Sequence, residues 1–256
     1  MSFENLLSQG QRALEEDDSR KAMEFLQEAV GLDQTAEVWL LLAEAQLDEN
    51  QLSRAKKSVT EGLKLEPENV ELLYLSADIS LEEERINPAI ETYKRIIDID
   101  PQQVDARVNK AILEMDVDRF EEAEKSCREA LQQDPNSALA LNALGDICIA
   151  VEKVQEATEC YLKAVESDPE EPQSYLNLAE LYYETDKMEE AEQMCNKALQ
   201  LDAGLPLGYL TLGYIYMDWD RSREAVENFQ QFLKLEKSPA AKQIRDEVNA
   251  VIEGLK

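Results

Sequence analysis

Residues 138–171 read ALALNALGDICIAVEKVQEATECYLKAVESDPEE, and the pattern in this stretch decides the fold. Apolar residues recur in it at helical spacing, in two runs. Gly145 and Ala157 are short enough to let the two helices of a hairpin approach closely. The stretch closes near Pro169, because the residue before a proline is pushed out of helical geometry. The sequence therefore predicts a pair of helices over these residues.

The pattern repeats along the chain with a period of 34 residues. Residues 34 apart form columns of similar residues. One column consists of prolines that each follow an acidic residue, namely Pro67, Pro101, Pro135 and Pro169. The period also holds in two columns of small residues, namely Ala43, Ala77, Ala111, Gly145, Ala179 and Gly213, and Ala55, Ala89, Ala123, Ala157, Ala191 and Ala225. Several columns in register indicate a repeat architecture.

The columns predict seven helix hairpins followed by one helix. An N-terminal unit with Gly10 and Ala22 lies 33 residues before the next one, so one residue is missing in the loop around residues 34–37. The expected hairpin spans are 3–35, 36–69, 70–103, 104–137, 138–171, 172–205 and 206–239. In the remaining residues 240–256, one helical face carries Ala241, Ile244, Val248, Val251, Ile252 and Leu255. We expect this helix to cap the last hairpin; the alternative is a helix that binds a partner.

The repeat resembles the tetratricopeptide repeat. In residues 172–205, the residues that carry the resemblance are Tyr175, Leu178-Ala179, Tyr182, Ala191 and Ala198. The resemblance covers about residues 3–239 and implies an all-α fold, a right-handed α-solenoid that forms a single domain over residues 1–256. It also implies that the first helices of the repeats line a concave wall on which another protein binds.

Some residues depart from the family pattern. Arg107 and Lys110 stand where the motif expects large apolar residues, so the first helix of residues 104–137 is expected to be the least well packed. Asn87, which a proline follows, is expected to be the N-cap of a helix. Whether the centre around residues 76–116 is a hinge stays open.

The composition argues against several classes of function and location. Lys and Arg number 26 and Asp and Glu 55, so the net charge of −29 opposes binding to nucleic acids or anionic membranes. No apolar run is long enough to span a membrane, and no secretory signal is apparent. The four cysteines have no CxxC spacing, which favours buried thiols in a reducing, cytoplasmic location.

The sequence also lacks the residue patterns of enzymes. Histidine is absent, and no phosphate-binding glycine loop, Cys/His pair or metal-ligand cluster is present. Pairs of acids such as Glu180 and Glu184 are common on any acidic helix and carry no weight alone. We expect no catalytic residues, no cofactor and no metal.

Candidate binding residues are placed by their distance from the small-residue column on each first helix. Three of the four columns that face the expected groove are strongly acidic and contain no Lys or Arg. The candidates are Glu44, Asp78, Asn109, Asn142, Asp146, Asn177, Glu180, Tyr183, Glu184 and Tyr214. The asparagines offer paired donors and acceptors for a peptide backbone, and the two tyrosines offer an apolar anchor. General surface acidity remains the alternative.

These observations favour a protein-interaction scaffold, either chaperone-like or an assembly adaptor. Its partner would be a Lys- and Arg-rich segment held in an acidic concave groove. The family's carboxylate clamp for acidic C-termini is not expected, because the matching positions are Glu, Asp, Leu or Tyr. The alternative function is a structural scaffold that assembles with itself through the array ends or the convex face. The oligomeric state stays open, with a monomer favoured.

Overall fold

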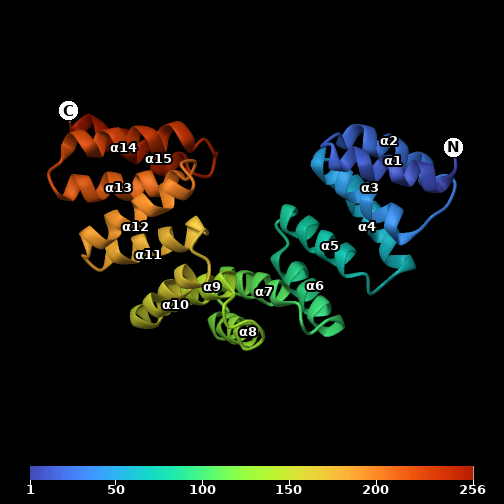
Figure 1. The fold of residues 1–256 in the computed structure, drawn as a ribbon, viewed down its shortest axis with the longest axis horizontal. Coiled ribbons are helices and arrows are strands. Elements are labelled where there is room, and N and C mark those ends of the chain that lie inside the picture. Colours follow the sequence, from blue (N-terminus) through green and yellow to red (C-terminus); the bar gives the residue numbers. More distant parts are fainter. Residues whose placement is uncertain (256) are drawn as a thin grey trace. The chain divides into compact units, whose positions relative to one another are not determined.

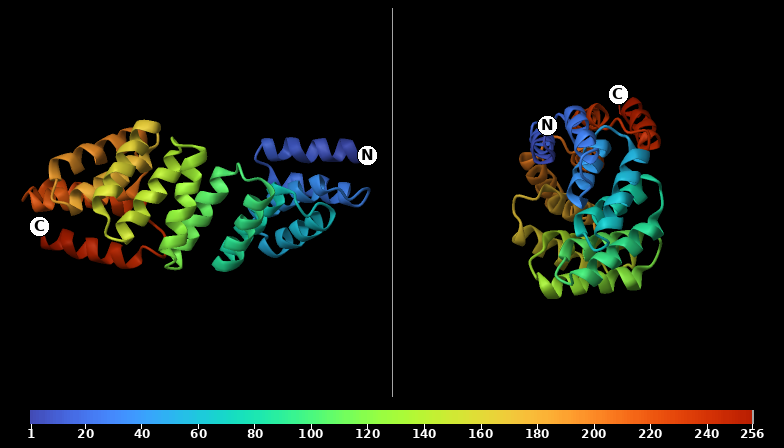
Figure 2. Two further views of the ribbon diagram at one scale, coloured as in Figure 1. Left: turned by 90° about the horizontal axis from the view of Figure 1, so that it is seen from below. Right: turned by 90° about the vertical axis from the view of Figure 1, so that its right-hand side faces the viewer.

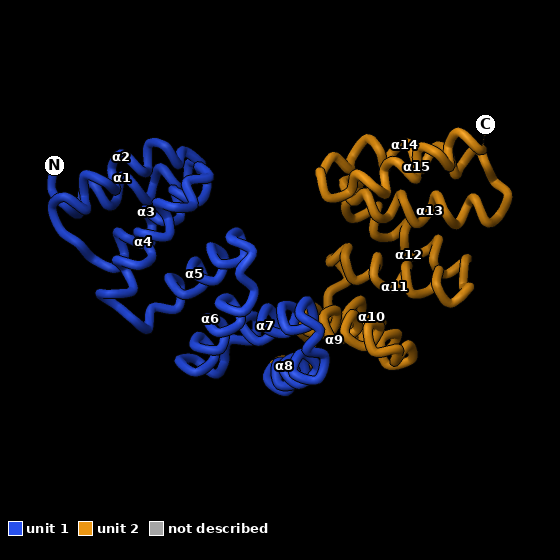
Figure 3. Tube along the Cα trace, turned by 180° about the vertical axis from the view of Figure 1, so that it is seen from behind, with its two compact units in different colours: residues 1–133 blue, residues 134–256 orange. Residues whose placement is uncertain are grey.

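The protein is an all-α solenoid, seen in a computed structural model that describes residues 1–255. The described part of the chain contains fifteen helices and no strand (Figure 1). It divides into two compact units, residues 1–133 and 134–256, which Figure 3 shows in two colours. The division falls close to the expected boundary between the fourth and fifth hairpins.

Each unit is a stack of helix hairpins. Unit 1 holds α1 (Phe3–Glu15), α2 (Ser19–Val30), α3 (Ala36–Asp48), α4 (Leu52–Leu65), α5 (Val70–Glu82), α6 (Ile86–Ile99), α7 (Val104–Asp116) and α8 (Phe120–Gln133). Unit 2 holds α9 (Ala138–Ala150), α10 (Val154–Ser167), α11 (Pro172–Glu184), α12 (Met188–Leu201), α13 (Pro206–Asp218), α14 (Ser222–Leu235) and α15 (Lys242–Gly254). The seven predicted hairpins and the final helix are confirmed.

The helices within a unit form two layers. Each second helix packs against the first helix of the next hairpin, as α10 does against α11 and α12 against α13. Neighbouring first helices also touch, as α9 and α13 both contact α11. Figure 2 shows the helices from two further directions. We call α9, α11 and α13 the first-helix layer of unit 2, and α10, α12 and α14 its second-helix layer. One side of each first helix therefore stays open to a ligand.

The two helices of a hairpin cross where the first one carries a small residue. A Cβ added at Gly145 would lie 2.3 Å from the Tyr161 ring, and one at Gly213 would lie 2.4 Å from Phe229. Other hairpins hold alanine at this position, as Ala179 does beside Cys195 and Ala77 beside Tyr93. The small-residue column is therefore a steric requirement of the hairpin.

The turn inside every hairpin has the same backbone conformation. Among residues 1–255, seven non-glycine residues take a positive φ between 56° and 62°: Asp17, Asn50, Glu84, Asp118, Glu152, Asp186 and Asp220. The next residue donates its amide to a carbonyl five positions back, as from Lys153 N to Cys148 O at 2.8 Å. This bond is part of the Schellman motif that ends many helices. The sequence analysis separated two helical runs here but did not identify the left-handed residue.

Helix α15 caps unit 2. Val248 is fully buried and Ile252 is 6% exposed, in a core that includes Phe229 and Phe232 of α14. The other residues of the predicted apolar face that join this core are Ile244, Val251 and Leu255. Because α15 covers the apolar side of the last hairpin, the predicted cap is confirmed.

Arg107 and Lys110 of α7 are largely buried, and Arg107 is bonded through Nη1, whereas its Nε has no partner. The Arg107 side chain is 8% exposed and its Nη1 donates to Pro101 O at 2.7 Å. Tyr175 makes the equivalent bond to Pro169 O at 3.2 Å, so the arginine takes the place of a tyrosine hydroxyl. The structure therefore gives no support to the expectation that α7 is the least well packed first helix.

Lys110 is held by a second polar network. Its Nζ donates to Glu114 Oε1 at 2.6 Å and to Ser126 Oγ at 2.9 Å. Ser126 Oγ in turn donates to Glu114 Oε2 at 3.0 Å, and both acceptors of this network are buried. Each polar group has a partner, which is the condition for burying such groups without a large penalty.

Two local predictions are wrong. Asn87 is not an N-cap, because α6 begins at Ile86 with Arg85 as its cap, and Asn87 Oδ1 instead accepts from Arg119 Nη2 at 2.6 Å. The residue missing from the first repeat is lost from a helix and not from the loop. Helix α2 has 12 residues where the other second helices have 14, and the loop after it is one residue longer.

Replacing Gly145 tests the steric requirement. We expect Gly145→Ala to destabilise the protein by about 1–3 kcal/mol, because the Tyr161 ring cannot move away without losing its own contacts. Gly254→Ala is the matched control, since nothing lies within 4 Å of the added Cβ. Chemical unfolding followed by circular dichroism measures both. Equal shifts of the two unfolding midpoints would contradict the packing argument.

Replacing Glu152 tests the backbone strain in the turns. The left-handed conformation costs a residue with a Cβ about 1–2 kcal/mol, and glycine avoids this cost but loses more entropy on folding. We expect Glu152→Gly to stabilise the protein by about 0.5 kcal/mol in the same unfolding measurement. Glu152→Ala keeps the Cβ and should give no gain. A comparable gain from alanine would instead point to the lost charge.

Candidate functional site

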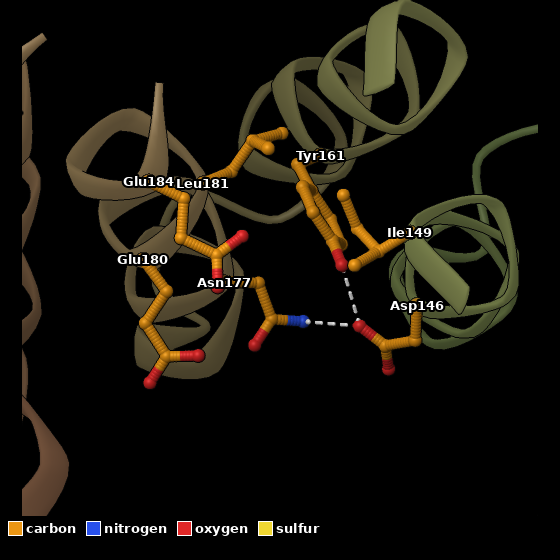
Figure 4. A pocket seen from close by; sticks show the side chains of 7 residues that line it. All are labelled: Asp146, Ile149, Tyr161, Asn177, Glu180, Leu181 and Glu184. Atoms are coloured by element: carbon orange, nitrogen blue, oxygen red, sulfur yellow. Dashed lines mark hydrogen bonds between the residues drawn. The ribbon is translucent and has the colours of Figure 1, made fainter. Parts of the chain in front are cut away.

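A pocket of about 180 Å³ opens between α9, α10 and α11 of unit 2. Its lining residues are Asp146, Ile149, Tyr161, Asn177, Glu180, Leu181 and Glu184. Figure 4 shows the three carboxylates around the pocket, with Tyr161 reaching in from α10. Four of the sequence-predicted site residues, Asp146, Asn177, Glu180 and Glu184, therefore come together here.

Asp146 is held in place by hydrogen bonds. The Tyr161 hydroxyl donates to its Oδ1 at 2.6 Å, and Asn177 Nδ2 donates to the same oxygen at 3.4 Å (Figure 4). Gln173 Nε2 donates to Asn177 Oδ1 at 2.7 Å, which orients that amide. The chain of bonds fixes the position of the Asp146 carboxylate before any ligand binds.

The pocket is electrostatically unbalanced. Desolvation raises the pKa of Asp146, although the Tyr161 hydrogen bond opposes this shift. Desolvation also raises the pKa of Glu180, and the charges of Glu184 and Asp146 raise it further. None of the seven lining residues is Lys or Arg. A cation placed here would relieve the repulsion between the carboxylates.

The two candidate tyrosines lie on neighbouring first helices. The rings of Tyr183 and Tyr214 stack at 6.4 Å between centroids, and Tyr214 also packs edge-on against Phe229 at 5.2 Å. The Tyr183 hydroxyl donates to Asp218 Oδ2 at 2.9 Å. Burial and, as the second cause, the hydrogen bond to Asp218 raise the pKa of Tyr183 to about 12. Both side chains are half-buried and pack against the core clusters of their hairpins.

Unit 1 carries a related arrangement. Asp78, Tyr93 and Asn109 precede Asp146, Tyr161 and Asn177 by 68 residues, which is two repeats. Burial, and next the charge of Asp78, raise the pKa of Tyr93 to about 12, while a hydrogen bond with Asn109 lowers it. Desolvation and the charge of Glu82 raise the pKa of Asp78.

The sequence analysis selected the acids and amides of these two sets and missed the tyrosines. Tyr93 and Tyr161 stand at motif positions on second helices, where an aromatic residue indicates core packing. The remaining candidate of unit 1, Glu44, is half-buried. Desolvation, then the charges of Asp48 and Glu71, raise the pKa of Glu44.

Asn142 does not lie on the open side of α9, in contrast to the expectation. It is 8% exposed, and its Nδ2 donates to Ser174 Oγ at 2.8 Å, where Ser174 is itself fully buried. The side chain therefore joins α9 to α11. It cannot contact a partner unless these two helices separate.

Tetratricopeptide repeat models match the chain over most of its length. They cover residues 40–104, 80–147, 145–186, 172–204 and 208–239. The chain belongs to the tetratricopeptide repeat family. The described residues form no helix long and apolar enough to cross a membrane and no cluster of potential metal ligands.

Solved structures share the fold at low sequence identity. A tetratricopeptide repeat protein from Parabacteroides merdae is 17% identical with a TM-score of 0.81, and the match covers 98% of both chains. PilF of Pseudomonas aeruginosa is 19% identical with a TM-score of 0.68, covering 84% of this chain and 96% of its own. Yeast Tom70 is 17% identical with a TM-score of 0.72, covering 99% of this chain and 53% of its own. No curated protein sequence matches the chain.

The family assignment supports a general function. Tetratricopeptide repeat proteins are generally non-enzymatic scaffolds that bind other proteins. A scaffold of this kind binds through the residues that its helices leave open, so the pocket around Asp146 and its neighbours is the candidate surface.

The raised pKa of Glu180 makes a testable prediction about stability. Its folded pKa lies above the ordinary value of 4.5, so the folded protein holds this proton more tightly than the unfolded chain. Ionisation therefore costs stability, and the cost develops as the pH rises through the range between these two pKa values. Glu180→Gln removes the cost, so it should raise the thermal unfolding midpoint at pH 7.

The advantage of Glu180→Gln should shrink as the pH falls below 4.5, where the wild-type carboxyl is protonated in both states. Thermal melts at a series of pH values measure it. Glu159→Gln is the control, because Glu159 is an exposed residue of α10 outside the pocket. A gain for Glu180→Gln that did not depend on pH would show that the carboxyl charge is not its cause.

Proposed function

We propose that the protein binds a Lys- and Arg-rich segment of a partner protein on the first-helix layer of unit 2. The observation that supports this most directly is the pocket with Asp146, Glu180 and Glu184, which has three carboxylates and no basic side chain in its lining. A Lys or Arg side chain from a partner would supply the missing positive charge.

The geometry favours capture of a cation at a prepared position. The hydrogen bonds from Tyr161 and Asn177 hold the Asp146 carboxylate, so binding does not have to order it. The walls formed by Ile149 and Leu181 can contact the aliphatic stem of a Lys or Arg side chain. Beyond the pocket, Tyr183 and Asp218 on α11 and α13 extend the surface with an aromatic face and a further carboxylate.

The expected strength is modest. Exposed ion pairs contribute about 0.2–1 kcal/mol each, and about 1.4 kcal/mol corresponds to a tenfold change in affinity. Three carboxylates acting together therefore account for about a tenfold effect. Because salt screens the attraction between exposed charges, largely so beyond about 10 Å at 0.1 M salt, the affinity should fall as the salt concentration rises.

The test compares two triple variants of equal net charge. Asp146→Asn/Glu180→Gln/Glu184→Gln neutralises the pocket, and Glu159→Gln/Glu166→Gln/Glu189→Gln neutralises exposed acids of α10 and α12. Each removes three negative charges and so changes the net charge from −29 to −26. Fluorescence anisotropy with a labelled Lys/Arg-rich peptide measures the affinity of each.

We expect the pocket variant to bind the peptide about tenfold more weakly than the wild type, and the control to change the affinity less than twofold. Equal losses for the two variants would show that the overall charge attracts the peptide and that the pocket has no special role. No binding by the wild type would rule the proposal out.

A further inference from the structure

Two exposed leucines stand on the first-helix layer of unit 2. Leu139 near the start of α9 is 46% exposed, and Leu207 near the start of α13 is 42% exposed. Both lie six residues before the small residue of their helix, and Gln173 holds the same place on α11. The core does not require an apolar residue at this position, and because single exposed leucines are common on protein surfaces, their significance depends on what lies near them.

On α11 this position is connected to the acidic pocket. Gln173 donates to Asn177, and Asn177 donates to Asp146, so the position and the pocket belong to one continuous surface. In unit 1, Gln11 Nε2 donates to Glu37 Oε1 at 3.1 Å. Gln11 lies one residue after the small residue of α1, and Glu37 lies six residues before the small residue of α3.

The contact between Gln11 and Glu37 also places Leu207. The two residues are 26 apart, and the corresponding spacing is 27 in the repeats of full length. In unit 2, the residues at the corresponding positions, 27 apart, are Glu180 and Leu207. The repeat relation therefore predicts that Leu207 lies next to Glu180, one of the pocket carboxylates.

The same position is acidic in unit 1. It holds Glu37, Glu71 and Asp105, which are all exposed. In unit 2 it holds Leu139, Gln173 and Leu207, none of which is charged. A surface shaped only by the acidity of the chain would carry acids at this position in both units. Unit 2 instead combines carboxylates with apolar side chains.

We propose that the segment bound by unit 2 is amphipathic, with apolar side chains on Leu139 and Leu207 and Lys or Arg side chains at Asp146, Glu180 and Glu184. The inference rests on the proposed function and adds the second half of the recognition chemistry. The pocket carboxylates call for basic residues in the segment, by charge complementarity. The exposed leucines call for apolar residues in it.

The experiment uses the full chain and two peptides. Both peptides carry Lys and Arg at the same positions; the first has leucine at the positions between them and the second has glutamine. The variant Leu139→Gln/Leu207→Gln copies the side chain that Gln173 already places on α11, so it should fold normally. The control Val154→Gln/Leu162→Gln removes side chains that are 42% and 41% exposed on α10, in the second-helix layer.

We expect the wild type to bind the leucine peptide about tenfold more tightly than the glutamine peptide. Leu139→Gln/Leu207→Gln should lose this preference and keep its affinity for the glutamine peptide, whereas the control should keep both affinities. Circular dichroism melts check that each variant is folded.

Two results would overturn the inference while leaving the proposed function intact: equal wild-type affinity for the two peptides, or the same loss in both leucine-removing variants. Failure of both peptides to bind the wild type would overturn the proposed function and, with it, this inference.

Discussion

Each hairpin depends on the close approach of its two helices, which is possible only where one of them lacks a bulky side chain. Gly145 leaves room for the Tyr161 ring, and through that space the Tyr161 hydroxyl reaches Asp146 at 2.6 Å. The contact that closes the hairpin therefore also positions a carboxylate on its open side. In the neighbouring hairpin the pair is Ala179 and Cys195, and no hydroxyl crosses, so Glu180 has no equivalent support. Packing and site geometry are linked at one residue pair.

Most of the fold follows from the sequence because steric requirements leave a mark at a fixed period. The helix pairs, their order and the final cap are all visible in columns of small and apolar residues. The turns are less visible, because the left-handed residue is Asp or Asn in some hairpins but glutamate at Glu84 and Glu152. At these two glutamates the Schellman hydrogen bonds of the backbone determine the conformation, so the residue type does not reveal it.

The site could be predicted only in part, for a related reason. Sequence position assigns a residue to a side of its helix, and Asp146, Asn177 and Glu180 do meet at one pocket. Position does not tell whether a polar side chain finds a partner in the next hairpin. Asn142 does, because Ser174 on α11 lies opposite it and both become buried. Arg107 shows the reverse case, in which a charged residue that suggests poor packing bonds to Pro101 O.

Recognition in a repeat protein has to use positions that the hairpin leaves unconstrained. The exposed position six residues before the small column is such a place, since Glu37, Gln173 and Leu207 all occupy it in hairpins of the same geometry. Because the fold tolerates each of these residues there, the difference between the acids of unit 1 and the leucines of unit 2 has no structural cause within the hairpin. An exposed leucine also favours solubility less than an acid does. Its place beside the pocket carboxylates is where an amphipathic ligand would use it.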